Sequence, residues 1–174
     1  MALSEAGARQ AVALGERLSR ESISTIYSSP RLRARATAEA IADRLGLEVE
    51  VDCALDEIDF GAWTGTSFDE LADDPSWRRW NEARATACPP GGETMVAAAA
   101  RIVGRIGRVW VQDRNPAAVV LVSHCDMIRA AVAHYLGLSL NNLLRFDIDP
   151  ASITRLEVGA WGGRVAALNE TTGI

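Results

Sequence analysis

A histidine stands where an apolar strand is predicted to end. His124 follows the continuous apolar run 117–123, and a helical segment, 127–136, begins three residues later. In open α/β sheets ligands bind beyond the carboxyl ends of the strands, and a helix N-terminus favours an anion. We therefore predict that His124 faces a ligand crevice. A hydrogen-bonded core histidine is the alternative interpretation.

Three arginines follow a second predicted strand. The strand 23–28 passes through a serine–proline turn into a helix that begins with Arg31, Arg33 and Arg35. A guanidinium at a helix start opposes the helix dipole, so it favours an anionic partner. At helical spacing the Arg33 side chain points in a different direction around the helix axis from those of Arg31 and Arg35. The three side chains therefore cannot all face the same side of the helix. Three solvated surface arginines remain the alternative interpretation.

A glutamate in an apolar setting is a candidate proton donor. Glu57 is close in sequence to Phe60 and Trp63. An apolar, aromatic neighbourhood raises the pKa of a carboxyl group towards the range of a general acid. Asp56 and Asp59 compete for this role, and an exposed acidic loop is the alternative interpretation. The glycine-rich loop 89–94 is weak evidence by itself, since such loops are common connectors.

The composition excludes several kinds of chemistry. The 18 basic residues are all arginine, so Schiff-base chemistry, a pyridoxal-phosphate anchor and a Walker-type lysine are ruled out. Two histidines and three cysteines without a Cys-x-x-Cys pair indicate neither a zinc site nor a disulfide framework. The net charge of −5 argues against nucleic acid as a partner. The composition therefore gives no indication of a cofactor.

The surrounding elements predict an α/β fold. We expect one domain over residues 1–174, a three-layer sandwich with a mostly parallel central sheet and helices on both faces. The segment 52–92 is predicted to be loops with short helices. Helices are expected at 4–20, 31–45, 93–112 and 127–136, and strands at 23–28, 47–51, 117–123, 152–158 and 164–169. The strand 117–123 is expected to be buried on both faces, because its apolar run is continuous.

Neither a membrane span nor a signal peptide is visible in the sequence. The apolar runs are far too short to cross a bilayer, and the first residues lack a basic-then-apolar pattern. With three cysteines that form no framework, this predicts a reducing, cytoplasmic location without a membrane partner. The sequence is also compatible with a homo-oligomer.

Four motifs in chain order resemble those of the histidine phosphatase superfamily, whose fold is phosphoglycerate mutase-like. They are Ser28-Ser29-Pro30 with Arg33-Ala34 and Thr37-Ala38; Leu55, Glu57, Phe60-Gly61, Trp63 and Gly65; Pro90-Gly91-Gly92-Glu93-Thr94; and Val122-Ser123-His124 with Ile128-Arg129. Their order and rough spacing agree over nearly the whole chain. Four motifs in order are far more specific than any one of them.

The resemblance implies a role for each matching residue. Arg33 would bind the transferred phosphoryl group, Glu57 would donate a proton, and His124 would stabilise the phosphoryl oxygens. A phosphohistidine intermediate would form without a metal. The substrate would be a small phosphorylated metabolite. Besides Arg33, the substrate would be bound by Gly92, Glu93, Thr94, Ser123 and Cys125.

The sequence departs from the family at its beginning. Members open with an apolar strand that ends in Leu-Val-Arg-His-Gly and carries the nucleophilic histidine, and this chain has no Arg-His-Gly. In the family that strand is central and lies next to the strand that bears His124. We therefore expect a gap in the sheet with apolar strand edges. A start assigned at an internal Met1, or an omitted segment, would explain the absence of the first strand and that of the nucleophilic histidine.

Other residues are poor replacements for the nucleophile. His134 lies within a predicted helix beside Tyr135 and is interpreted as a packing residue. Cys125 suggests a cysteine-dependent phosphatase, but Arg129 follows it after three residues instead of five, and no glycine lies between them. The prediction is a phosphomonoester hydrolase of the histidine phosphatase type. A non-catalytic phosphate-binding protein and phosphoglycerate mutase-type transfer are the alternatives.

Overall fold

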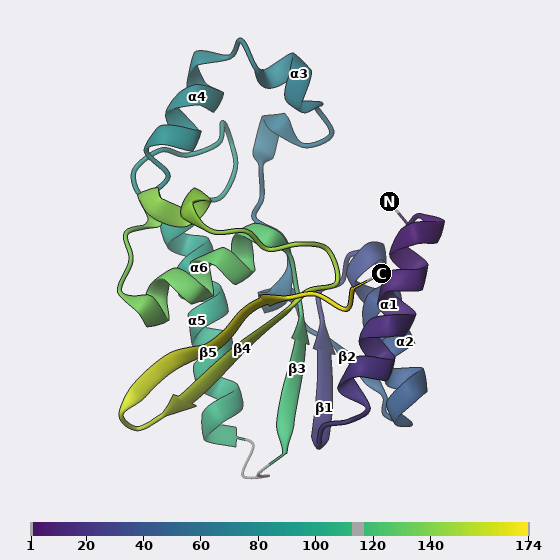
Figure 1. Cartoon of the computed structure of the whole chain (residues 1–174). Coiled ribbons are helices and arrows are strands. Elements are labelled where there is room, and N and C mark those ends of the chain that lie inside the picture. The colour runs from purple at the N-terminus through teal and green to yellow at the C-terminus, as the bar shows by residue number, and fades with distance from the viewer. Residues whose placement is uncertain (1, 113–116, 174) are drawn as a thin grey trace.

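The computed structural model describes residues 2–112 and 117–173 (Figure 1). Its helices are α1 (Glu5–Leu18), α2 (Leu32–Leu45), α3 (Phe68–Leu71), α4 (Pro75–Glu82), α5 (Met95–Gln112) and α6 (Cys125–Leu136). Its strands are β1 (Ile23–Ser28), β2 (Val49–Val51), β3 (Ala118–Val122), β4 (Ile153–Gly159) and β5 (Gly162–Glu170). The chain therefore has the predicted mixed α/β architecture.

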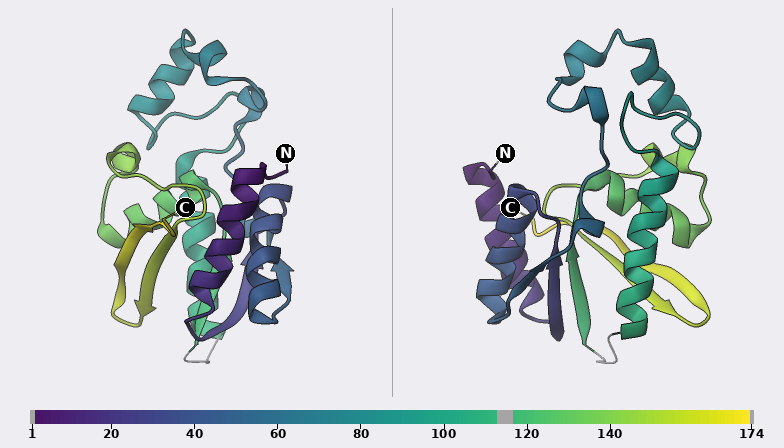
Figure 2. Two further views of the ribbon diagram at one scale, coloured as in Figure 1. Left: turned by 45° about the vertical axis from the view of Figure 1, so that its right-hand side comes forward. Right: turned by 180° about the vertical axis from the view of Figure 1, so that it is seen from behind.

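Strands β2, β1 and β3 form a parallel sheet with helices on both faces (Figures 1 and 2). Ile26 of β1 and Val120 of β3 are register partners, and both pack in the cluster that contains the buried side chains of α1 and α2. Their neighbours Tyr27 and Leu121 pack against the cluster formed by α5 and α6. This alternation follows the two-residue period of a strand and confirms the predicted three layers.

Local sequence signals fix the ends of the helices. The side chain of Ser4 accepts a hydrogen bond from the backbone N–H of Gly7 at 3.1 Å and begins α1, as its residue type favours. Gly46 and Gly137 end α2 and α6 with φ values of 69° and 66°, a left-handed conformation that glycine adopts without strain. The predicted helices therefore lie within two residues of the observed ones.

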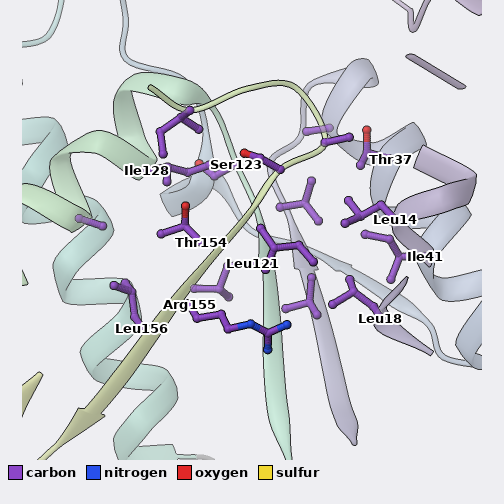
Figure 3. A pocket seen from close by; sticks show the side chains of 18 of the residues that line it. Leu14, Leu18, Thr37, Ile41, Leu121, Ser123, Ile128, Thr154, Arg155 and Leu156 are labelled. Carbon is purple, nitrogen blue, oxygen red and sulfur yellow. The ribbon is translucent and has the colours of Figure 1, made fainter. Parts of the chain in front are cut away.

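The sheet is interrupted between β3 and β4. In the part of the chain that the structure describes, β3 is an edge strand of the three-stranded sheet, and β4 pairs antiparallel with β5 alone. A groove of about 820 Å³ separates them (Figure 3). Its lining is mostly apolar and includes Leu14, Leu18, Leu121 and Leu156. The gap lies beside the strand that precedes His124, where the sequence predicts one.

The groove also changes the burial of β3. The expectation that residues 117–123 form a strand buried on both faces is wrong, because Val119–Val122 are only half-buried and Ala118 is exposed. A continuous apolar run shows that a strand is suited to a core. It does not show whether the neighbouring strand is in place, and here the free edge of β3 opens on the groove.

The segment between β2 and α5 forms a layer beyond the carboxyl ends of β1 and β3 (Figure 1). It contains short helices and loops, as predicted. Its core is aromatic: Trp80 is fully buried, and the ring of Trp63 meets that of Trp77 edge-on at 5.2 Å. None of the described helices is both long and apolar enough to cross a bilayer.

Candidate active site

The three residues expected to do chemistry converge beyond the carboxyl ends of β1 and β3. Arg33 lies in the first turn of α2, Glu57 follows a short helical turn, and His124 is the N-cap of α6. One guanidinium nitrogen of Arg33, Nη2, lies 2.9 Å from His124 Nδ1 and 3.5 Å from Glu57 Oε2. Glu57 Oε2 lies 3.7 Å from the same imidazole nitrogen. All three side chains line the groove.

The Glu57 carboxyl group has a pKa close to neutrality. Its burial, reinforced by the negative charge of Asp126, raises its pKa from 4.5 to about 7. The backbone N–H of Ile58 and the charge of Arg33 oppose this shift without cancelling it. The predicted upward shift is confirmed, and a group with such a pKa can hold and release a proton at neutral pH.

The His124 imidazole has the opposite shift. Burial, followed by the positive charge of Arg33, lowers its pKa from 6.5 to about 4. The ring is 5% exposed and is therefore neutral at pH 7 in this structure. An acidic neighbour with a raised pKa and a neutral imidazole with a lowered pKa thus face one arginine.

Asp56 accepts hydrogen bonds from several groups at the edge of this cluster. Its Oδ1 accepts hydrogen bonds from Arg31 Nε at 2.7 Å, from the Ser29 hydroxyl at 3.2 Å and from the backbone N–H of Glu57 at 2.8 Å. Burial would raise the pKa of this carboxyl group, but the bonds from Arg31 and Glu57 hold it below its usual value. Asp56 is therefore an ionised scaffold residue beside the candidate donor.

The three arginines near the start of α2 have three different partners. Arg31 pairs with Asp56, Arg33 with Glu57, and Arg35 with Glu39 on the surface of the same helix at 3.1 Å. Only Arg33 also reaches the histidine. The prediction that the three side chains cannot face one way is confirmed.

Sequence reasoning missed Arg101, which holds the loop that carries Glu57. From α5, its guanidinium donates to the backbone carbonyls of Ala54 at 3.1 Å and Asp56 at 2.9 Å, with a longer contact to that of Glu57 at 3.4 Å. The only signal in the sequence is a single charged residue after an alanine-rich apolar run. The carbonyl groups that it holds lie more than 40 positions away, and nothing local indicates them.

The glycine loop 89–94 acts in the structure as a support for the same region. The Glu93 carboxylate takes two hydrogen bonds from Arg101, at 2.7 Å and 3.1 Å. Thr94 accepts the backbone N–H of Ala97 and so starts α5. A side chain at Gly92 would collide with the Asp59 carbonyl, so the two loops touch through backbone alone. The substrate contacts predicted for Gly92, Glu93 and Thr94 stay predictions.

Ser123 and Cys125 flank the histidine with contacts to the scaffold. Ser123 donates to the Leu55 carbonyl at 2.7 Å, and the Cys125 thiol contacts the Ile148 carbonyl at 3.6 Å. Both line the groove, so their predicted role in substrate binding stays a prediction. Burial raises the pKa of the Cys125 thiol, which disfavours the thiolate that a cysteine nucleophile needs.

The second histidine lies away from the cluster. His134 is ten residues along α6 from His124, about 15 Å at the rise of a helix. Its side chain is exposed, although its ring contacts that of Tyr135 edge-to-face with centroids 5.0 Å apart, so its interpretation as a packing residue is wrong. The residue faces outwards from its helix, which its neighbours in sequence do not reveal. The described residues contain no group of three or more potential metal ligands.

A buried ion pair lies beside the site. Arg84 donates to Asp126 at 2.8 Å, and the two side chains are 7% and 12% exposed. The Arg84 guanidinium also lies 5.3 Å from the centre of the Trp80 ring. The negative charge of Asp126 contributes to the raised pKa of Glu57. The ion pair therefore contacts the aromatic segment through Arg84 and acts on the candidate acid through Asp126.

Comparison with known proteins identifies the class to which this arrangement belongs. The family model of the histidine phosphatase superfamily (branch 1) matches residues 1–171, and the chain belongs to this superfamily. It is 34% identical over 171 residues to phosphoserine phosphatase 1 of Hydrogenobacter thermophilus, covering 97% of this chain and 81% of that protein.

Other relatives differ in length and in what they are named for. The chain is 37% identical to the bifunctional protein Rv2228c of Mycobacterium tuberculosis, with 98% of this chain aligned to 47% of the relative, so it spans about half of that protein. Among solved structures, the mycobacterial glucosyl-3-phosphoglycerate phosphatase Rv2419c with inorganic phosphate superposes with a TM-score of 0.84 at 34% identity. That match covers 99% of this chain and 89% of the other.

Proposed function

We propose that this protein is a phosphomonoester hydrolase that works through a phosphohistidine intermediate on a small phosphorylated metabolite. The observation that carries the proposal is the convergence of Arg33, Glu57 and His124 within 4 Å at one end of the groove. Hydrolysis of a phosphate monoester needs a cation to hold the phosphoryl oxygens and an acid to protonate the leaving oxygen. It also needs a further group that stabilises the negative charge on the phosphoryl oxygens in the transition state. The three side chains supply these functions.

Each side chain has a role that suits its chemistry. Arg33 grips the phosphoryl oxygens with its planar fork, which matches them in pairs. Glu57 holds a proton at pH values up to about 7 and gives it to the leaving oxygen. His124 stabilises the phosphoryl group from the N-terminus of α6, where the helix dipole adds to the effect.

The nucleophile in this proposal comes from a strand that fills the groove between β3 and β4. Of the two histidines in the sequence, His124 already has a role and His134 is exposed on α6. The groove runs from the Glu21–Arg155 ion pair to the Arg33–His124 contact, and one of its sides is the free edge of β3. A strand parallel to β3 would deliver its last residue beside His124, and the resemblance to the family supports a histidine as that residue.

The test is an assay of two matched proteins. The first is the 174-residue chain, and the second is the chain extended by an apolar strand ending in Arg-His-Gly, either encoded upstream or designed. We expect only the extended protein to release phosphate from p-nitrophenyl phosphate and phosphoserine and to show a phosphohistidine signal by phosphorus NMR. Failure of both extended forms to turn over any phosphomonoester at mildly acidic to neutral pH would overturn the proposal.

Variants of the extended protein separate the roles. Glu57→Gln should lower turnover by about 10²–10⁴-fold, the usual contribution of a general acid. The control Glu48→Gln, an exposed residue near β2, should leave turnover unchanged. Equal turnover in both variants would remove Glu57 from the mechanism.

A second candidate function is phosphate binding without turnover. It is favoured by the single imidazole at the site and predicts that the 174-residue chain itself binds inorganic phosphate through Arg33 and His124. Calorimetry with phosphate, together with absence of turnover in the extended protein, would support it. Phosphoglycerate mutase-type transfer would instead appear as movement of the phosphoryl group between substrate hydroxyls without net release.

A further inference from the structure

We propose that Ser29 and Asp56 are positioning residues that hold the His124 imidazole in its Nε2–H tautomer and direct its other nitrogen, Nδ1, towards the ligand. The tautomer follows from the contacts of this chain alone. Its consequence for a bound phosphoryl group rests on the function proposed above.

The hydroxyl group of Ser29 links the ring to a carboxylate. Ser29 is fully buried, and its Oγ lies 2.8 Å from His124 Nε2 and 3.2 Å from Asp56 Oδ1. It also accepts the backbone N–H of Arg31 at 3.2 Å. A hydroxyl has one proton to donate, and an ionised carboxylate can only accept. Ser29 therefore donates to Asp56, and the ring must donate to Ser29 from Nε2–H.

The other side of the ring leads to the same assignment. Arg33 Nη2 lies 2.9 Å from His124 Nδ1, and a guanidinium has donors but no acceptor. A proton on Nδ1 would therefore face another proton. With Nδ1 unprotonated, the Arg33 N–H donates to it, and both ring nitrogens are satisfied. Two independent contacts on opposite sides of the ring thus select one tautomer.

Asp56 is fixed strongly enough to maintain this chain of hydrogen bonds. Its Oδ1 is also held by Arg31 Nε and by the backbone of Glu57, so the carboxylate cannot turn away without breaking both contacts. The charged groups that act on His124 come from α2, the loop after β2, and α5. They are Arg31, Arg33, Asp56, Glu57 and Arg101.

The arrangement prepares the ring to receive an anion. When a phosphate takes over the Arg33 guanidinium, Nδ1 loses its donor and can accept a proton from solvent. The ring then donates from Nδ1 to a phosphate oxygen and from Nε2 to Ser29, and Asp56 balances its charge through the hydroxyl. The ring keeps its orientation in both protonation states, which is the benefit of a positioning residue.

The test uses nitrogen NMR of the imidazole rings in the 174-residue chain. Because there are only two histidines, the variant His134→Gln assigns both rings. We expect His124 to be the Nε2–H tautomer at pH 7 and to remain so in Asp56→Asn, whose amide oxygen can still accept from Ser29. In Ser29→Ala only the Arg33 contact still selects this tautomer, so the population of the Nε2–H form should fall. Ser19→Ala, which changes an exposed serine at the end of α1, should leave that population unchanged.

Phosphate binding provides the second readout. Titration with inorganic phosphate should give about tenfold weaker binding in Ser29→Ala and in Asp56→Asn than in Ser19→Ala. Ser29→Ala loses the hydrogen bond from the ring, and Asp56→Asn keeps the bond from Ser29 but loses the negative charge that balances the protonated ring. An Nδ1–H tautomer in the unaltered chain, or an undiminished population of the Nε2–H tautomer in a folded Ser29→Ala, would overturn the proposal. If the unaltered chain binds no phosphate, the second candidate function is contradicted and the titration is made on the extended protein, while the tautomer measurement still decides the role of Ser29.

Discussion

The polar cluster around His124 and the groove beside β3 are neighbouring regions that are organised in opposite ways. In the cluster, Arg33, Glu57 and His124 contact one another and are supported by Asp56 and by α5. In the groove, two half-buried strands face each other across about 820 Å³ without hydrogen bonds in the described part of the chain. The side chains of the cluster are in contact although the described strands beside the groove do not pair with each other.

The difference shows which part of the site depends on this chain alone. The cluster is built from α2, the loop after β2, and α6, and its contacts are hydrogen bonds between groups already present. In the proposed function, a further strand pairs the free edge of β3 and covers the apolar lining of the groove. Substitutions in the cluster should therefore be costly in the 174-residue chain, whereas substitutions in the groove should cost little.

The largest expected effect comes from the buried ion pair beside the cluster. Asp126→Ala leaves the buried Arg84 guanidinium without its carboxylate partner and should lower the free energy of unfolding by about 3–5 kcal/mol. The pKa of Glu57 should also fall, because a negative charge that raises it is gone. Urea unfolding measures the first effect and carbon NMR of the Glu57 carboxyl group the second.

A matched surface pair provides the control for this prediction. Asp73 lies 3.7 Å from Arg78 and is fully exposed. Asp73→Ala should therefore change stability by less than about 1 kcal/mol. Equal losses in the two variants would mean that the cluster is no more tightly organised than the surface.

The next effect concerns the arginine that holds the Glu57 loop. Arg101→Met removes two hydrogen bonds to Glu93 and those to the carbonyls of residues 53, 54, 56 and 57, so we expect a loss of about 3 kcal/mol. Hydrogen exchange should become faster in residues 53–57. Arg108→Met, an exposed arginine of the same helix, should show neither change. Loss of stability without faster exchange would indicate that Arg101 does not hold this loop.

The convergence of the three site residues was predicted through the resemblance, which assigns all three to one phosphoryl group, and the observed strand order gives the physical reason for two of them. Parallel strands end at the same edge of a sheet, so the segments after β1 and β3 must meet. This brings Arg33 and His124 together before any side-chain contact is known. The glycines that end α2 and α6 are local signals of the same kind.

The support of the site could not be predicted, because it consists of contacts between distant residues. Arg101 reaches carbonyls more than 40 positions away, and Glu93 is held by that same arginine. The resemblance predicted the gap beside β3, but the apolar run 117–123 by itself does not show whether a neighbouring strand is present, so the burial of β3 was predicted wrongly. The outward direction of His134 depends on how α6 packs, not on its own residue type.

The pH dependence of stability should separate the two shifted groups of the cluster. Glu57 has a folded pKa of about 7 against 4.5, so its contribution is lost as the pH rises from 4.5 to 7. His124 has a folded pKa of about 4 against 6.5, so its contribution is lost as the pH falls from 6.5 to 4. Between pH 4.5 and 6.5 the two slopes have opposite signs and should nearly cancel.

Removing either group should reveal the slope of the other. In Glu57→Gln, stability should fall by about 2 kcal/mol from pH 6.5 to 4.5, and in His124→Gln it should rise by about the same amount. Urea midpoints at several pH values measure both. The window stays above pH 4.5, because Glu21, whose pKa its Arg155 contact lowers to about 2, loses its contribution below that value. Identical slopes in the two variants would contradict the opposed shifts.

The smallest effect tests the groove. Leu156→Ala removes a half-buried side chain of β4 that lines the open space, so it leaves little new cavity and should cost about 1 kcal/mol. Leu143→Ala, at a fully buried position of the same core cluster, should cost about 2–5 kcal/mol. If the extended protein seats a strand against β4, the Leu156→Ala cost should rise towards that of Leu143→Ala in that protein alone. An unchanged Leu156→Ala cost in an active extended protein would mean that the added strand lies elsewhere, because a strand in the groove must contact the side chains that line it.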